Sequence, residues 1–237
     1  MTDTSADANV PRLLSLAVHE FRTPLSVVGG YLRMVLKDPT TNTLNDRYRW
    51  MLGEAEKSCA RLAALVAEMS DLSALESGKA TLKRALFDLR PVLGEAIALL
   101  PGVPERTVEV ELTTGQGPAM IEGDSPRLKT ALAALLHGLR REVVSTDRLV
   151  VRERSGDFRG KPASWIAVAD ADHIDVLESA SDAALTPFDH WREGVGFSIV
   201  IACRIIEGHG GAVWSLAGSP KAGDPRKSTA VVMLPLK

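Results

Sequence analysis

Two long runs of apolar residues at helical spacing dominate the first third of the chain. Between residues 11 and 76 the apolar positions alternate in steps of four and three, as in the a/d stripe of packed helices. They are Leu14, Val18, Phe21, Leu25, Val28, Leu32 and Val35, then Tyr48, Leu52, Ala55, Cys59, Leu62, Val66, Met69, Leu72 and Leu75. The segment DPTTNTLND separates the runs, and its Pro39 cannot continue a helix. The pattern predicts an antiparallel helical hairpin.

A hairpin alone buries only one face of each arm. Because the apolar stripe runs the full length of both arms, two hairpins can share one core as a four-helix bundle. We therefore predict a homodimer. The alternative is a hairpin that packs only on the rest of its own chain, and the length of the stripe makes it the weaker interpretation.

Composition is that of a globular protein and excludes several functions. The 237 residues are 45% hydrophobic and 24% charged, with a formal net charge of -2. This balance gives no basic field for nucleic acid, and 5% aromatic residues make a base-stacking surface improbable. No signal peptide and no apolar run of about 18 residues is present, which predicts a cytoplasmic protein without direct membrane insertion. Cys59 and Cys203 lie far apart, as expected of reduced, buried thiols.

The pattern changes near residue 80, in the stretch SGKATLKRA. Helical periodicity is expected over 87–100, 125–144 and 196–211, with Ser125 as a cap, and strands over 107–114, 118–124, 148–156, 163–170, 212–218 and 229–236. Helices and hairpin-linked strands in separate runs predict an α+β sandwich, with helices on one face of a mixed sheet. The predicted organisation is a disordered N-terminus (1–10), the hairpin (11–78) and the sandwich domain (79–237).

His19 is the candidate reactive residue of the hairpin. It follows the stripe position Val18, so we expect it at the edge of the packed face and partly exposed. Thr23 stands one turn further along on the same side, and Pro24 should bend the helix. A carboxylate such as Glu20 beside one ring nitrogen fixes the tautomer and makes the other nitrogen more nucleophilic.

The string HEFRTPL within such a hairpin closely resembles the phosphoacceptor motif of bacterial sensor histidine kinases, and the second half of the chain follows the order of their ATP-binding domain. The resemblance implies that His19 accepts a phosphoryl group on Nε2. It implies further that Glu20 is the acid/base partner and that Thr23 orients a water molecule for dephosphorylation. The implied partner is the receiver domain of a response regulator, whose aspartate takes the phosphate, and the implied cofactors are ATP and Mg²⁺.

The motifs that hold ATP and Mg²⁺ in this family are eroded. On the asparagine-bearing helix, Ala134 and Gly138 stand at the two asparagine positions, so Gly138 replaces the usual Mg²⁺ contact and no metal ligand is certain. The neighbouring His137 is a substitute ligand or, more simply, a surface histidine. Arg141 occupies a position where lysine is typical.

The aspartate turn and the glycine loop are also altered. Asp170 fits the adenine-reading position, but Asp172 and Ile174 replace the two turn glycines. The lid is largely deleted. Gly194 and Gly196 of the glycine loop persist, and phosphate binding or tight helix–strand packing explains them equally well. The weak nucleotide site expected here comprises Asp170, Gly194, Gly196 and Arg141.

The motifs of the chain suggest four candidate functions. The first is a histidine kinase core that is phosphorylated on His19 and passes the phosphate to a response-regulator aspartate. The second is an ATP-independent histidine phosphotransferase or phosphatase, and the third is a pseudokinase adaptor with weak or no ATP binding. The fourth, an unrelated ATPase of the wider superfamily, conflicts with the histidine hairpin. An intact His19, Glu20 and Thr23 favour the first two, and the eroded ATP motifs favour the second over the first.

Overall fold

A computed structural model describes residues 4–38, 44–102, 107–144, 146–180, 184–190, 196–216 and 225–237. The chain divides into two compact units, Met1–Ala80 and Thr81–Lys237, each of which is described by itself. The division falls within the stretch SGKATLKRA, where the composition changes. No helix of the described part combines the length and the apolar character needed to cross a membrane.

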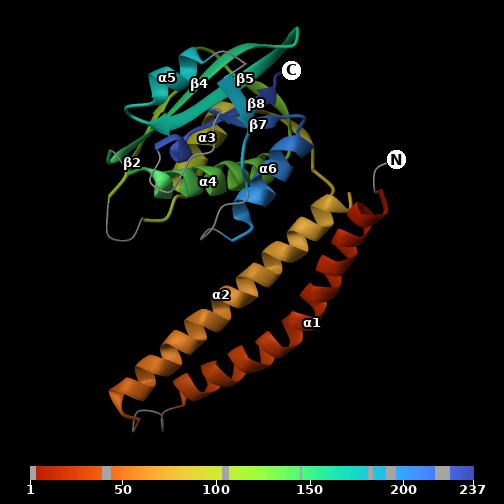
Figure 1. Cartoon of the computed structure of the whole chain (residues 1–237), viewed down its shortest axis with the longest axis vertical. Coiled ribbons are helices and arrows are strands. Elements are labelled where there is room, and N and C mark those ends of the chain that lie inside the picture. Colours follow the sequence, from red (N-terminus) through yellow and green to blue (C-terminus); the bar gives the residue numbers. More distant parts are fainter. Residues whose placement is uncertain are drawn as a thin grey trace. The chain divides into compact units, whose positions relative to one another are not determined.

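The first unit is a hairpin of two long helices, α1 (Thr4–Lys37) and α2 (Asp46–Glu76). Asn45 caps α2, since its side chain accepts a hydrogen bond from the Arg47 amide at 2.8 Å. The helix ends at Glu76, with Gly78 in the left-handed region (φ 65°) that favours glycine. Figure 1 shows that α1 curves along its length, as expected of a helix that contains Pro24. The predicted turn residue Pro39 lies outside the described residues.

The helix α1 begins earlier than expected. The sequence predicted disorder over residues 1–10, yet residues 4–10 are helical. This polar segment contains two alanines, the strongest helix formers, and it extends a helix that is already nucleated by the hairpin.

The second unit is an α+β sandwich, which confirms the predicted fold class. A six-stranded mixed sheet has the order β2-β4-β5-β8-β7-β6, in which only β2 and β4 run parallel, and β1 and β3 form a separate two-stranded sheet. The strands are β1 (Ala85–Asp88), β2 (Glu109–Thr113), β3 (Met120–Gly123), β4 (Arg148–Phe158), β5 (Lys161–Asp170), β6 (Leu185–Pro187), β7 (Ala212–Leu216) and β8 (Ala230–Pro235). The helices are α3 (Leu89–Ala98), α4 (Ser125–Glu142), α5 (Ile174–Ser179) and α6 (Ser198–Gly208).

The prediction that helices lie on only one face of the six-stranded sheet was wrong, because the short α5 packs on the other face. Figure 1 shows α3, α4 and α6 on one face and the short α5 on the other. The main core lies beneath the three larger helices. A second apolar cluster lies under α5, where Ile174 and Leu177 pack on Ala167 and Ala169 of β5. Both faces of the central strands are therefore partly buried. Most residues of β5 are buried, whereas none of the residues of the edge strand β2 is.

Four elements differ from the sequence prediction. The helix expected from Phe87 begins at Leu89 instead, because Phe87 and Asp88 end the strand β1 and the Asp88 side chain caps α3 by accepting a hydrogen bond from the Arg90 amide. Asp124, not Ser125, caps α4, because its carboxylate accepts the Arg127 amide at 3.1 Å. The elements α5 and β6 were not predicted, since each is shorter than the periodicity of a sequence can reveal.

Both cysteines are buried thiols outside any disulfide, as the sequence predicted. Cys59 contributes to the packing of the hairpin, where its Sγ lies 3.4 Å from the Leu25 carbonyl oxygen. Cys203 lies within the buried face of α6.

Candidate functional site

His19 lies on the open surface of α1. Its side chain is 84% exposed, and that of Glu20 is 69% exposed. The preceding residue, Val18, is buried against the hairpin, which fixes the orientation of this helical turn. Thr23 is also exposed and lies one turn along the same face. The structure therefore brings the three predicted residues to one solvent-facing patch.

The geometry of His19 suits a nucleophile. Its Nδ1 lies 3.5 Å from Oε1 of Glu20, so the carboxylate favours a proton on that ring nitrogen. The lone pair is then left on Nε2, the nitrogen expected to attack a phosphorus atom. Because both side chains stand in solvent, the partner that brings the phosphoryl group can approach Nε2 without displacing other residues.

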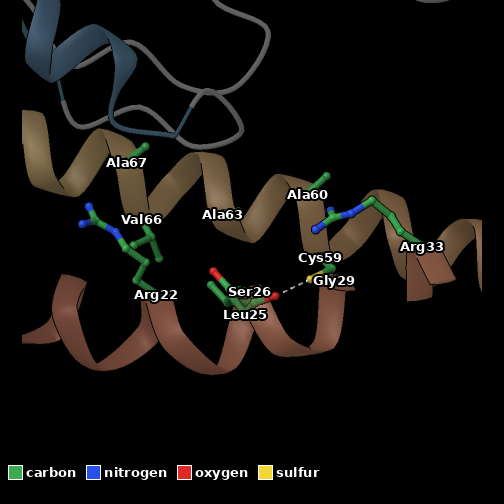
Figure 2. Close-up of a pocket in the computed structure, with 10 residues that line it drawn as sticks. All are labelled: Arg22, Leu25, Ser26, Gly29, Arg33, Cys59, Ala60, Ala63, Val66 and Ala67. Atoms are coloured by element: carbon green, nitrogen blue, oxygen red, sulfur yellow. Dashed lines mark hydrogen bonds between the residues drawn. The ribbon is translucent and has the colours of Figure 1, made fainter. Parts of the chain in front are cut away.

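A small hollow of about 150 Å³ lies between the two helices next to this patch. Figure 2 shows Arg22 and Arg33 at its two ends, with Ser26 and Gly29 of α1 between them. A Cβ atom on Gly29 would stand 3.2 Å from Sγ of Cys59, so glycine lets α1 and α2 approach closely here. The close approach at Gly29 therefore lies within the lining of the hollow.

The predicted adenine-reading residue, Asp170, is enclosed by its own chain. Its side chain is 0% exposed. Oδ1 accepts the amides of Asp172 and His173, and it lies 2.6 Å from Nδ1 of His173. Oδ2 accepts a hydrogen bond from the Ser228 hydroxyl at 3.1 Å. A bound base cannot reach this carboxylate unless the surrounding residues move.

A buried isoleucine holds the segment after Asp170 against the sheet. Ile174 replaces a turn glycine, and it begins α5 with 1% of its surface exposed. Its side chain joins the apolar cluster on the outer sheet face, together with Leu177. This burial draws the segment toward the sheet and places His173 over Asp170.

Gly138, at the position of the family's metal contact, packs tightly against α6. Gly138 is buried in α4, and a Cβ atom built on it would stand 2.4 Å from Cδ1 and 3.1 Å from Cγ1 of Ile199. Ile199 is 1% exposed and belongs to α6. The space that an asparagine side chain needs is therefore filled by Ile199.

His137 does not replace the missing ligand. It is half-buried, and burial lowers its pKa, with the charges of Arg140 and Arg141 acting in the same direction. Its Nδ1 has no hydrogen-bond partner among the described residues. Mg²⁺ prefers oxygen ligands, and the described residues contain no group of three His, Cys, Asp or Glu side chains that could hold a metal ion.

Of the other predicted nucleotide contacts, Gly196 has a positive φ of 63° just before α6, and Arg141 is exposed in the last turn of α4. Gly194 lies outside the described residues. With Asp170 enclosed and the space beside Gly138 filled, the described residues do not fit the family's way of holding ATP and Mg²⁺.

Residues 12–78 match the His Kinase A (phospho-acceptor) domain family. The sensor histidine kinase GacS of Pseudomonas protegens is 29% identical over 204 residues, which is 82% of this chain and 22% of that protein. The chain carries a two-component histidine kinase core. The sensory/regulatory protein RpfC of Xanthomonas campestris is 26% identical over 240 residues, covering 93% of the kinase core and 32% of that protein. The core thus spans less than a third of these relatives' length.

Solved structures show the same fold. Full-length ShkA in complex with AMPPNP matches the kinase core with a TM-score of 0.66 and 21% identity, over 95% of this chain and 45% of that chain. The Acinetobacter baumannii histidine kinase AdeS matches with a TM-score of 0.53 and 18% identity, over 92% and 97% of the two chains. Both matches support the hairpin followed by a mixed α/β domain.

Sequence reasoning missed three residues that shape this part of the core. His173, Ser228 and Ile199 enclose Asp170 or fill the space beside Gly138. The glycine replacements gave a signal that the site was altered. Nothing in the sequence indicated that a histidine three residues after Asp170 would bind it.

Proposed function

We propose that His19 carries a phosphoryl group on Nε2 and exchanges it with the aspartate of a response-regulator receiver domain. The observation that carries the proposal is the exposed His19 with its Nδ1 facing the Glu20 carboxylate at 3.5 Å. Glu20 acts as the acid/base partner. Exchange with a receiver domain would place this core in the cytoplasm.

Thr23 has a second role in the proposal. Its hydroxyl lies on the same exposed face as His19, one turn along α1. A water molecule held there would be placed between the helix and a docked receiver domain. Thr23 would then serve hydrolysis of the phosphorylated partner, whereas His19 serves transfer.

The hairpin acts as half of a dimer in this proposal. Val18, Leu25 and Leu32 of the α1 stripe are buried or half-buried against α2. The intervening stripe residues remain open: Phe21, Val28 and Val35 are 54%, 51% and 42% exposed. Because the open residues recur every seven positions along one line, a second hairpin can cover them and complete a four-helix bundle.

A second candidate source of the phosphate follows from the altered nucleotide site. Full burial of Asp170 and the side chain of Ile199 beside Gly138 both oppose binding of ATP with Mg²⁺. These two observations favour a core that takes its phosphate from a phosphorylated receiver domain. In that case the reaction is a reversible transfer between an aspartyl phosphate and Nε2 of His19.

The test compares two phosphate donors. The full chain is incubated with γ-labelled ATP and Mg²⁺, or with a label-bearing phosphorylated receiver domain from the same organism. Acid-labile label that is lost in His19→Gln but kept in His137→Gln supports the proposal. Label from ATP establishes the kinase reaction, and label from the receiver alone establishes the relay. Absence of label on His19 from either donor would refute the proposal.

A further inference from the structure

The outer face of the sheet carries a cluster of three aromatic rings from three different strands. The ring centroids of Trp165 and Trp214 are 5.9 Å apart, with an angle of 25° between the planes. Phe158 lies 5.7 Å from Trp165 at 70° and 5.6 Å from Trp214 at 48°. Three of the chain's 11 aromatic residues thus gather at one place, where their rings form one continuous apolar surface.

This aromatic cluster borders a hollow of about 400 Å³. Asp157, Arg159 and Leu185 complete its lining. Pockets that hold small molecules have volumes of roughly 300–1,000 Å³, apolar or aromatic walls and a few polar groups. The hollow combines these properties on the sheet face that carries α5, and none of His19, Glu20 and Thr23 lines it.

The rim of the hollow is built on a strained turn. Arg159 has a φ of 54° and is the only residue other than glycine with a positive φ in the described part of the chain. Together with Gly160 (φ 78°) it forms the tip of the β4–β5 hairpin, where asparagine is the usual first residue. Strained backbone conformations persist where the surrounding structure enforces them, and they cluster at functional sites. Here the Arg159 guanidinium lies 5.0 Å from the Phe158 ring centroid, at the rim.

The lining of the hollow carries one carboxylate, Asp157, and one guanidinium, Arg159. The Asp157 carboxylate is partly satisfied within the turn, since it accepts the Gly160 amide at 2.8 Å. The guanidinium of Arg159 is therefore the charged group of the lining that is open to a ligand, whereas Arg154 lines only the adjoining depression, together with Glu178. A Cβ atom on Gly156 would stand 3.1 Å from Cδ1 of Trp165, so glycine gives the indole its room here.

We propose that this hollow binds a planar aromatic molecule that carries one carboxylate. The ring stacks on the Trp165–Trp214 surface, and the carboxylate pairs with the Arg159 guanidinium. A neutral aromatic molecule lacks the second interaction. This site lies outside the phosphotransfer residues, and its existence does not depend on the proposed function.

The test uses 2-naphthoate as the probe and the neutral 2-naphthalenemethanol as its matched analogue. Binding to the full chain is measured by calorimetry, and the indole NMR signals show where the probe lies. We expect saturable binding of naphthoate with a Kd near or below about 1 mM. The signals of Trp165 and Trp214 should shift, while that of the hairpin residue Trp50 stays in place.

The decisive variant is Arg159→Asn, because asparagine tolerates the positive φ and keeps the hairpin folded. It should weaken naphthoate binding about tenfold and leave the neutral analogue unchanged. Arg148→Gln, at the far end of the same strand, is the control and should change neither affinity. Absence of saturable naphthoate binding, an unchanged affinity in Arg159→Asn, or shifts confined to Trp50 would overturn the proposal.

Discussion

The tight contact between α4 and α6 allows a quantitative test of the packing beside Gly138. The perturbation is a double-mutant cycle of Gly138→Ala and Ile199→Val. The first change adds a Cβ atom 2.4 Å from Cδ1 of Ile199, and the second removes that Cδ1 atom. The cycle therefore measures the contact that leaves no space for a longer side chain at residue 138.

The magnitudes follow from the packing. Overfilling a packed core costs about 1–3 kcal/mol, and replacing helical glycine by alanine returns about 1 kcal/mol, so Gly138→Ala should cost about 0–2 kcal/mol. Ile199→Val alone should cost about 0.5–1.5 kcal/mol as a buried methyl deletion. In the double variant the clashing atom is gone, so the two costs do not add. We expect a favourable coupling free energy of about 1–2 kcal/mol.

The assay is urea unfolding followed by tryptophan fluorescence. A Trp50→Phe background removes the hairpin tryptophan, so that the signal reports the second unit. The reference and the three variants are compared at equal protein concentration, because dimerisation adds to apparent stability. Coupling below about 0.3–0.5 kcal/mol, the level expected of independent sites, would refute the argument that Ile199 fills the space beside Gly138.

Three further predictions address the hairpin and the folded core of the second unit. Val28→Glu places a charge on the open stripe and should shift the protein from dimer to monomer in sedimentation, with its helicity retained. Asp124→Ala should destabilise the second unit by about 1–3 kcal/mol at pH 7, through loss of the α4 cap. Burial of the Asp124 carboxyl opposes ionisation, but backbone N–H donors outweigh it and lower its pKa. This stabilisation is thus present above the unfolded pKa of about 4 and is lost as pH falls through the lowered value, so the variant should show a flatter acid unfolding profile. Glu153→Gln should cost about 3–5 kcal/mol in urea unfolding, because it leaves the buried Arg90 without its 2.7 Å ion pair.

The sequence predicted the hairpin well because its signal is repeated. Sixteen apolar stripe positions indicate the same two helices. The candidate residue His19 directly follows the stripe residue Val18, which predicted its exposed position. The buried members of the stripe face the other arm, and the exposed members face outward. Because every stripe position supports the same two helices, the prediction of the hairpin does not depend on any one of them.

The prediction was weaker where a single residue decides the structure. The cap of α4 was assigned to Ser125, one residue late, because aspartate and serine serve equally well at such a position. The contact of His173 with Asp170 depends on α5, a six-residue helix held by the burial of Ile174. A helix of that length has no periodicity to read, so its tertiary packing is invisible in the sequence.

The changes in the nucleotide region lie on separate elements, and this separation bears on what the second unit is for. Gly138 and Ile199 pair α4 with α6, whereas Asp170 and His173 belong to the end of β5 and the start of α5. A substitution that changes one of these two contacts therefore leaves the other unchanged. The core around them is nevertheless fully packed, and Ile199 occupies the space beside Gly138. The comparison of the two phosphate donors therefore also decides whether the second unit acts through ATP or through a surface such as the aromatic hollow on the outer sheet face.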